Sequence, residues 1–188
     1  MIISVFPNFI QRIIRNSEEN FYHVINGCNQ CGYGGNLHRH GSYSRTIICH
    51  EITTIIKIQR VICPDCRKTH AIIPSDLIPY FQHTLETIIK LLELIKCKKE
   101  SYSKLINHFR RCNLSFSLGH VTLYVKRFES NFFNLCYYYR IYHNSFLPPT
   151  ASEADALIHL NRFELNIFNA DYFNKMPNYF LSEIITKG

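Results

Sequence analysis

Short hydrophobic runs in the middle of the chain predict β-strands. Residues 44–50, 53–62 and 69–73 are rich in Ile, Thr and Val, whose branched side chains fit a pleated sheet. A turn is expected at residues 51–52, between the first two runs. The glycine-rich residues 32–41 are expected to form a loop before them. Together the three runs predict a small antiparallel sheet.

The second run predicts a strand with two different faces, because successive side chains of a strand point to opposite sides. One face is mostly apolar, and the other is polar and basic. The first contains Ile56, Ile58, Arg60 and Ile62, and the second contains Lys57 and Gln59. Near the N-terminus, the apolar side chains of residues 9–14 have helical spacing, and residues 21–25 fit a short strand.

Beyond Pro74 and Pro79 the apolar spacing becomes helical. Residues 80–96 carry apolar side chains on nearly every side, which is typical of a helix in the centre of a core. These side chains belong to Phe81, Leu85, Ile88, Ile89, Leu91, Leu92, Leu94 and Ile95. We therefore expect this helix to be central to a helical module.

Residues 101–132 predict a helix-turn-helix. Ser101 is a candidate N-cap for a short helix, residues 110–113 turn the chain, and Ser115 or Ser117 can cap the next helix. One stripe of this next helix is apolar and contains Leu118, Val121, Val125, Phe128 and Phe132. The opposite side presents Gly119, His120, Leu123, Lys126, Arg127 and Ser130. Such a helix fits a recognition helix, and an ordinary amphipathic surface helix is the alternative.

The C-terminal part of the chain is rich in aromatic residues. The run Tyr137–Arg140, with three tyrosines, can stack on nucleobases, although such a run more often packs in a core or an interface. Pro148 and Pro149 interrupt the chain, and Ser152 precedes a predicted helix that ends near Phe163. This tail suits packing or self-association.

Two cysteine pairs carry the clearest candidate chemistry. Cys28 and Cys31 form one Cys-x-x-Cys motif, and Cys63 and Cys66 form another. Four thiolates are a complete tetrahedral ligand set for structural zinc, and a hairpin between the pairs would bring them together. Two disulfides, a redox-active pair or structural thiols are alternatives. So is a site in which His38, His40 or His70 replaces one cysteine.

We therefore expect one structural Zn²⁺ and an α+β fold in three parts. Residues 1–78 are predicted to be a zinc-ribbon domain with an N-terminal extension. Residues 79–135 are predicted to be a helix-turn-helix module, and residues 136–188 a helical tail. The four remaining cysteines are expected to be small buried hydrophobic residues, and they are Cys49, Cys97, Cys112 and Cys136.

Composition and charge indicate the compartment and the partner. The chain has 188 residues, a net charge of +7, no signal-peptide pattern and no apolar stretch of membrane-spanning length. A reducing cytoplasm is therefore expected, where clustered cysteines favour metal over disulfides. Residues 37–68 hold six basic and two acidic residues, and residues 96–127 hold eight basic residues and one acidic residue. Such concentration indicates a polyanion-binding surface, with a solvated basic face as the alternative.

Double-stranded DNA is the expected partner. Basic side chains of the ribbon and of the helix-turn-helix would contact phosphates, and the recognition helix would enter the major groove. The candidate DNA-binding residues are Arg39, Arg45, Lys57, Arg60, Arg110, Arg111, His120, Lys126 and Arg127.

Two segments around the second cysteine pair resemble a known family. Residues 37–45 read Leu-His-Arg-His-Gly-Ser-Tyr-Ser-Arg, and residues 58–71 read Ile-Gln-Arg-Val-Ile-Cys-Pro-Asp-Cys-Arg-Lys-Thr-His-Ala. They are similar to the zinc ribbon of insertion-sequence transposases, and especially to a bacterial family of short transposase-like proteins with that ribbon and a helix-turn-helix. The resemblance extends over about residues 25–130 and implies DNA binding.

The resemblance does not extend to a nuclease domain. Transposases of this kind continue into a domain whose spaced acidic residues hold two metal ions. The acidic residues of the tail fit no such strand pattern, and they are Glu153, Asp155, Glu164, Asp171 and Glu183. We therefore expect a non-enzymatic protein, either a mobile-element accessory or a transcriptional regulator. The alternatives are the DNA-binding subunit of a split transposase, with a catalytic partner or as a homodimer, and a zinc-ribbon module that binds proteins.

Overall fold

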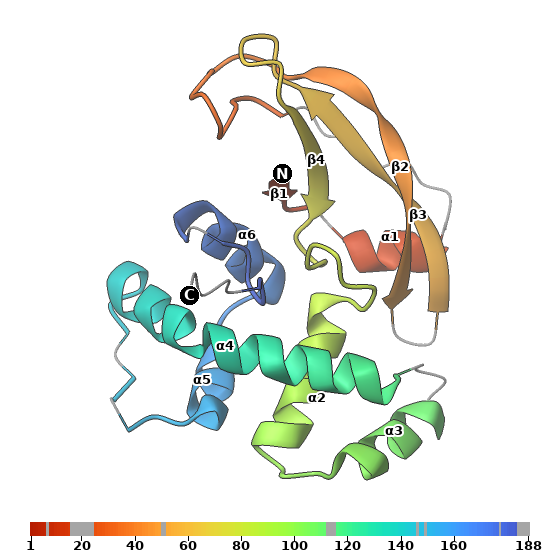
Figure 1. Ribbon diagram of the computed structural model, residues 1–188, viewed down its shortest axis with the longest axis vertical. Coiled ribbons are helices and arrows are strands. Elements are labelled where there is room, and N and C mark those ends of the chain that lie inside the picture. Colours follow the sequence, from red (N-terminus) through yellow and green to blue (C-terminus); the bar gives the residue numbers. More distant parts are fainter. Residues whose placement is uncertain are drawn as a thin grey trace.

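The computed structural model describes residues 1–6, 8–15, 25–49, 52–111, 116–145, 147–148, 150–176 and 178–183, without the side chains of residues 14 and 15. Within them the chain forms one four-stranded sheet and six helices (Figure 1). The predicted α+β class is therefore confirmed. The sheet and α1 (Phe9–Arg15) lie at one end of the molecule, and the helices α2 to α5 lie at the other (Figure 1).

The sheet has the strand order β1-β4-β3-β2. A long antiparallel hairpin of β2 (His38–Cys49) and β3 (Ile52–Ile62) makes up half of it, β4 (Thr69–Pro74) pairs with β3, and β1 (Ile2–Ser4) adds in parallel to β4. The three predicted strands are present, and β1 was not predicted. β2 also begins inside the predicted loop, at His38, because the polar start of an edge strand needs no apolar pattern to pair.

The burial of β3 departs from the expected faces opposite a β-bulge of β2 near Gly41. Arg39 pairs with Val61 and Ser42 pairs with Gln59, so β2 carries one extra residue there, and Gly41 has a φ of +83°. Gln59, predicted to lie on a polar face, is buried, as is Val61, whereas Arg60 is exposed. The prediction of one apolar and one polar face was wrong at this end of the strand, because the face with Gln59 and Val61 is covered here, whereas Arg60 on the other face is exposed.

The helices follow the apolar spacing, with shifted ends. They are α2 (Leu85–Lys96), α3 (Tyr102–Arg111), α4 (Leu118–Tyr142), α5 (Glu153–Leu160) and α6 (Leu165–Lys175). The Ser117 and Ser152 side chains cap α4 and α5, as predicted. α2 begins five residues later than predicted, because residues 80–84 are not helical and Thr84 is its N-cap. Residues 21–24 of the strand predicted at 21–25, Cys112 and Asn113 of the predicted turn, and the candidate cap Ser115 lie outside the described residues.

Two hydrophobic cores organise the described residues. One surrounds the sheet and α1, and the other extends from Ile78 to Leu181 and contains α2, α4 and α5. α4 crosses the expected boundary at residue 135 without a break, and its buried Tyr138 and Tyr139 pack into the second core. The C-terminal part therefore shares a core with the helices before it.

The segment between β4 and α2 joins the two cores. The Asn169 side chain of α6 donates hydrogen bonds to the carbonyl oxygens of Ser75 and Leu77, at 2.7 and 3.1 Å. From the hairpin, the amide of Ile48 donates to the carbonyl of Gln82 at 2.8 Å, and the amide of Thr84 donates back to Ile48 at 3.2 Å. The junction is thus held by hydrogen bonds from both sides, one set from the backbone of the hairpin and the other from the Asn169 side chain.

Candidate metal centre and neighbouring surfaces

The two cysteine pairs form matching turns, one before β2 and one between β3 and β4. In the first turn, the amide of Gly32 donates to the carbonyl oxygen of Cys28 at 2.9 Å. In the second turn, the amide of Arg67 donates to the carbonyl oxygen of Cys63 at 3.1 Å. The amides of Cys28 and Cys63 in turn donate to the carbonyls five residues later, at 2.7 and 3.0 Å. Both turns therefore present their two cysteines in the same way.

The four sulfur atoms lie at the spacing of a tetrahedral metal site. Cys28 Sγ is 3.8 Å from Cys66 Sγ, and Cys31 Sγ is 3.7 Å from Cys63 Sγ, with all four sulfurs within 4.8 Å of one another. Zn–S bonds of about 2.3 Å in a tetrahedron place sulfurs about 3.8 Å apart. All four cysteines are free thiols. The cluster can therefore hold a metal ion such as zinc.

Backbone groups and one histidine support the thiolate form of Cys28. Desolvation raises the pKa of the Cys28 thiol, but hydrogen bonds to the sulfur, among them those from the amides of Gln30 and Cys31, together outweigh this effect and lower the pKa to about 6. His70 is buried, and its Nε2 lies 3.3 Å from Cys28 Sγ. His38 and His40 are exposed on β2. The side chains placed to hold a metal are thus the four cysteines, with His70 beside them as a hydrogen-bonding partner.

The residue after each pair has a left-handed backbone. Gly32 has a φ of +78° and Arg67 a φ of +59°. Glycine takes this conformation without cost, whereas other residues lose about 1–2 kcal/mol. The second turn therefore holds an exposed basic side chain where the backbone favours glycine.

Most candidate basic residues of the ribbon face solvent. Arg39, Lys57 and Arg60 are exposed, as are Arg67 and Lys68 of the second cysteine turn. Arg45 differs, because it is half-buried and its Nη2 donates to the carbonyl oxygens of Ile78, at 2.6 Å, and Phe81. Arg45 therefore holds the junction segment as well as carrying charge.

The candidate residues of α3 and α4 also divide into exposed side chains and side chains that are engaged within the protein. Arg110 and Arg111 are exposed at the end of α3, and Lys126 is exposed on α4. The His120 ring, by contrast, accepts a hydrogen bond from the Ser117 amide at 3.3 Å in the capping box. Arg127 forms an ion pair of 3.1 Å with Glu183. These last two side chains are engaged within the protein.

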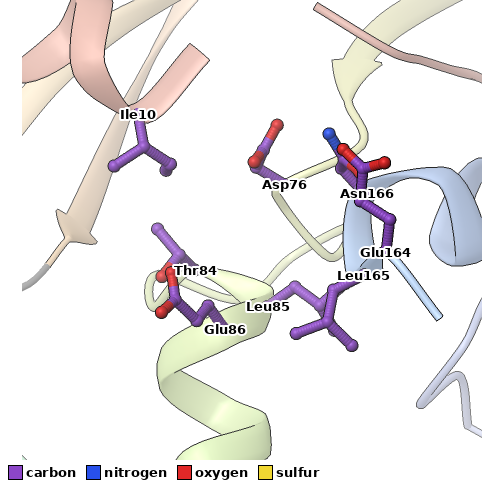
Figure 2. A pocket seen from close by; sticks show the side chains of 8 residues that line it. All are labelled: Ile10, Asp76, Thr84, Leu85, Glu86, Glu164, Leu165 and Asn166. Carbon is purple, nitrogen blue, oxygen red and sulfur yellow. The ribbon is translucent and has the colours of Figure 1, made fainter. Parts of the chain in front are cut away.

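Residues that the sequence analysis did not connect form an acidic cleft on another side. Asp76 of the junction, Glu86 of α2 and Glu164 before α6 line it, next to Ile10 and Asn166 (Figure 2). Burial, with a further contribution from the two glutamates, raises the pKa of Asp76 to about 6. Three separate segments supply these carboxyl groups, so no local motif could have predicted them.

Asp76→Asn is expected to stabilise the protein at pH 7 by about 1–3 kcal/mol. The carboxyl has a pKa of 3.8 in its ordinary state and about 6 in the fold. Below about pH 4 the Asp76 carboxyl is protonated in both the folded and the unfolded chain. Between about pH 4 and pH 6 this carboxyl ionises in the unfolded chain only, so the free energy of unfolding of the parent falls as pH rises. Urea unfolding of both proteins at several pH values measures the difference. A difference that stays constant between pH 4 and pH 7 would contradict this account.

The described residues include no helix that is both long and apolar enough to cross a bilayer.

Residues 28–111 match the family described as "Domain of unknown function (DUF6431)". The match begins at the first cysteine of the metal centre and ends with α3. It therefore includes all four cysteines but less than half of the chain. Comparison with curated proteins and with solved structures gives no match.

Proposed function

We propose that this protein binds double-stranded DNA through a ribbon that a structural zinc ion holds together. The supporting observation is the set of exposed basic side chains on the ribbon that carries the four-cysteine cluster. This set contains Arg39, Lys57, Arg60, Arg67 and Lys68, with Asp65 as the acidic residue among the described positions 37–68. Phosphates attract such a surface strongly, because each contact releases counterions from DNA.

A second basic surface lies on the helical part. Arg110 and Arg111 are exposed in the last turn of α3, and Lys126 is exposed on α4. In the proposal these side chains contact the phosphate backbone next to the groove that α4 approaches. Arg127 and His120 take a smaller part, because the first is paired with Glu183 and the second with the α4 cap.

Three acidic residues of the tail are engaged within the fold, which favours a binding role, whereas Glu164 lines the acidic cleft. Glu153 pairs with Lys96 at 2.6 Å, and Asp171 accepts a hydrogen bond from Tyr138 and pairs with Lys175 at 2.9 Å. Asp155 belongs to the α5 capping box. Together with the resemblance of residues 37–45 and 58–71 to a transposase zinc ribbon, these roles favour a DNA-binding accessory of a mobile element or a regulator.

Duplex binding over a salt series tests the proposal. A labelled duplex of mixed sequence should bind, with affinity falling steeply as salt rises. Arg110→Ala and Arg60→Ala should each weaken binding and reduce the slope of log K against log salt by about one unit. Fluorescence anisotropy of the labelled duplex measures both quantities.

Arg140→Ala is the matched control, because Arg140 is an exposed arginine on α4 outside both basic surfaces. It should bind as the parent does. If no salt-dependent duplex binding occurs, or if the three arginine variants all behave alike, the assignment to these surfaces is wrong.

A second candidate function is docking on another protein. Phe133, Tyr137 and Ile141 are 80%, 46% and 51% exposed on α4. Large apolar side chains gathered on one helix favour a protein partner, such as the catalytic subunit of a split transposase or a second copy of this chain. Protein association without salt-sensitive DNA binding would favour this candidate.

A further inference from the structure

A cleft of about 500 Å³ lies between the sheet and the junction segment. Tyr43 and Arg45 of β2 and Ala71 and Ile73 of β4 line one side of this tyrosine cleft, and Tyr80 and Phe81 of the junction line the other. Its volume is typical of a site for a small ligand or a single nucleotide. Neither the four-cysteine cluster nor the acidic cleft shares a lining residue with it.

Two exposed aromatic rings stand at this cleft. Tyr43 is 41% exposed and Tyr80 is 81% exposed. Tyr80 also has a left-handed backbone, with a φ of +69°, which costs a residue other than glycine about 1–2 kcal/mol. Burial does not offset this cost, because the ring faces solvent. The Tyr80 ring makes a tilted contact with the Tyr179 ring, with 6.1 Å between the ring centroids. Strained backbone that presents an exposed ring is typical of a binding residue.

The junction holds Tyr80 in this position. Arg45 Nη2 donates to the carbonyl oxygens on either side of it, those of Ile78 and Phe81. The amide of Phe81 donates to the carbonyl of Ile78 at 3.2 Å, which closes the turn. The ring is therefore presented by a fixed loop rather than by a free one.

The charge of the cleft is positive. Arg45 is half-buried, and among the described residues no carboxylate forms an ion pair with it. Arg60 is exposed and pairs across the sheet with Ala71, so the two side chains point to the same face as the cleft. None of the residues that line the cleft is acidic. Guanidinium groups in such a place favour phosphate.

We propose that the tyrosine cleft binds one unpaired nucleotide of a DNA strand. Its base stacks on Tyr80 beside Tyr43, and its phosphate lies near Arg45 and Arg60. A base inside a duplex has both of its faces covered by neighbours, whereas an unpaired base at an end, gap or loop can stack on an aromatic side chain. This inference rests on the proposed DNA binding and adds a preference for duplexes with an unpaired segment.

The test compares a blunt duplex with the same duplex carrying a short single-stranded overhang. The parent protein should bind the overhang duplex more tightly than the blunt one. Tyr80→Ala should weaken binding to the overhang duplex by about tenfold to a hundredfold and leave binding to the blunt duplex unchanged. Tyr80→Phe, which keeps the ring, should bind both as the parent does.

Phe133→Ala is the matched control, because Phe133 is an equally exposed ring on α4. It should leave both affinities unchanged, and thermal melting of each variant confirms folding. If the parent binds blunt and overhang duplexes equally, the cleft proposal is overturned while the proposed function stands. If single strands bind through Tyr80 and blunt duplexes do not bind, the cleft proposal stands and duplex binding fails. If free nucleotide competes as well as an overhang of the same base, the assignment to a strand is overturned.

Discussion

Removal of the metal is expected to unfold the ribbon and to leave part of the helical structure intact. Structural zinc in small domains contributes on the order of 10–16 kcal/mol of apparent binding free energy, as much as the whole stability of a typical domain. The buried Cys28 and Cys63 belong to the core around the sheet, so that core depends on the site. The core around α2 and α4 contains none of the four ligands.

Elemental analysis and circular dichroism with and without a chelator measure this prediction. One zinc per chain should be present, and chelation should remove the strand signal before the helical one. Cys63→Ser should have the effect of chelation, whereas Cys136→Ser, at a half-buried cysteine on α4, should keep the metal and the ribbon. A ribbon that stays folded after full metal removal would show that the sheet core is sufficient without zinc.

Phe128→Ala is expected to lower the free energy of unfolding by about 3–5 kcal/mol. Phe128 is fully buried on α4, in the core that α2 and α5 share. Removal of the ring loses its apolar burial and leaves a cavity that the surrounding helices fill only in part. Urea unfolding should give a lower midpoint with an unchanged slope.

Phe133→Ala provides the comparison on the same helix. Phe133 is 80% exposed, so its loss should change the free energy of unfolding by no more than about 0.5 kcal/mol. Equal losses for the two variants would mean that α4 is not packed as described. The pair therefore separates the buried side of α4 from the side that faces solvent.

Local signals predicted much of this structure, and long-range contacts explain most of the rest. The cysteine turns were predictable, because ligand type and spacing are local properties of each pair. The caps at Ser117 and Ser152 are local in the same sense. The roles of Arg45 and Arg127 were not predictable, because their partners lie in segments 33 or more residues away.

At the sheet, too, local sequence predicted the strand, whereas long-range contacts determine which side chains are buried. A run rich in Ile, Thr and Val correctly located β3, but the burial of its faces depends on what covers each side of the sheet. Gln59 is buried because its face of the sheet is covered there, and Tyr80 is exposed because the junction turns it outward. Neither outcome follows from the hydrophobicity of the residue itself.

The fixed junction has a consequence for the length of DNA that the protein can contact. Hydrogen bonds hold residues 75–84 on both sides, from the backbone of the hairpin on one side and from the Asn169 side chain of α6 on the other. Two basic surfaces joined in this way lie at a fixed distance from each other. Domains on a flexible linker, by contrast, adjust to different spacings. Because the two strands of DNA rotate with each base pair, a rigid protein can meet its two contact regions in one rotational register only. In the proposed complex, the protein thus sets the distance between the two contact regions, and the DNA must present its phosphates at that distance.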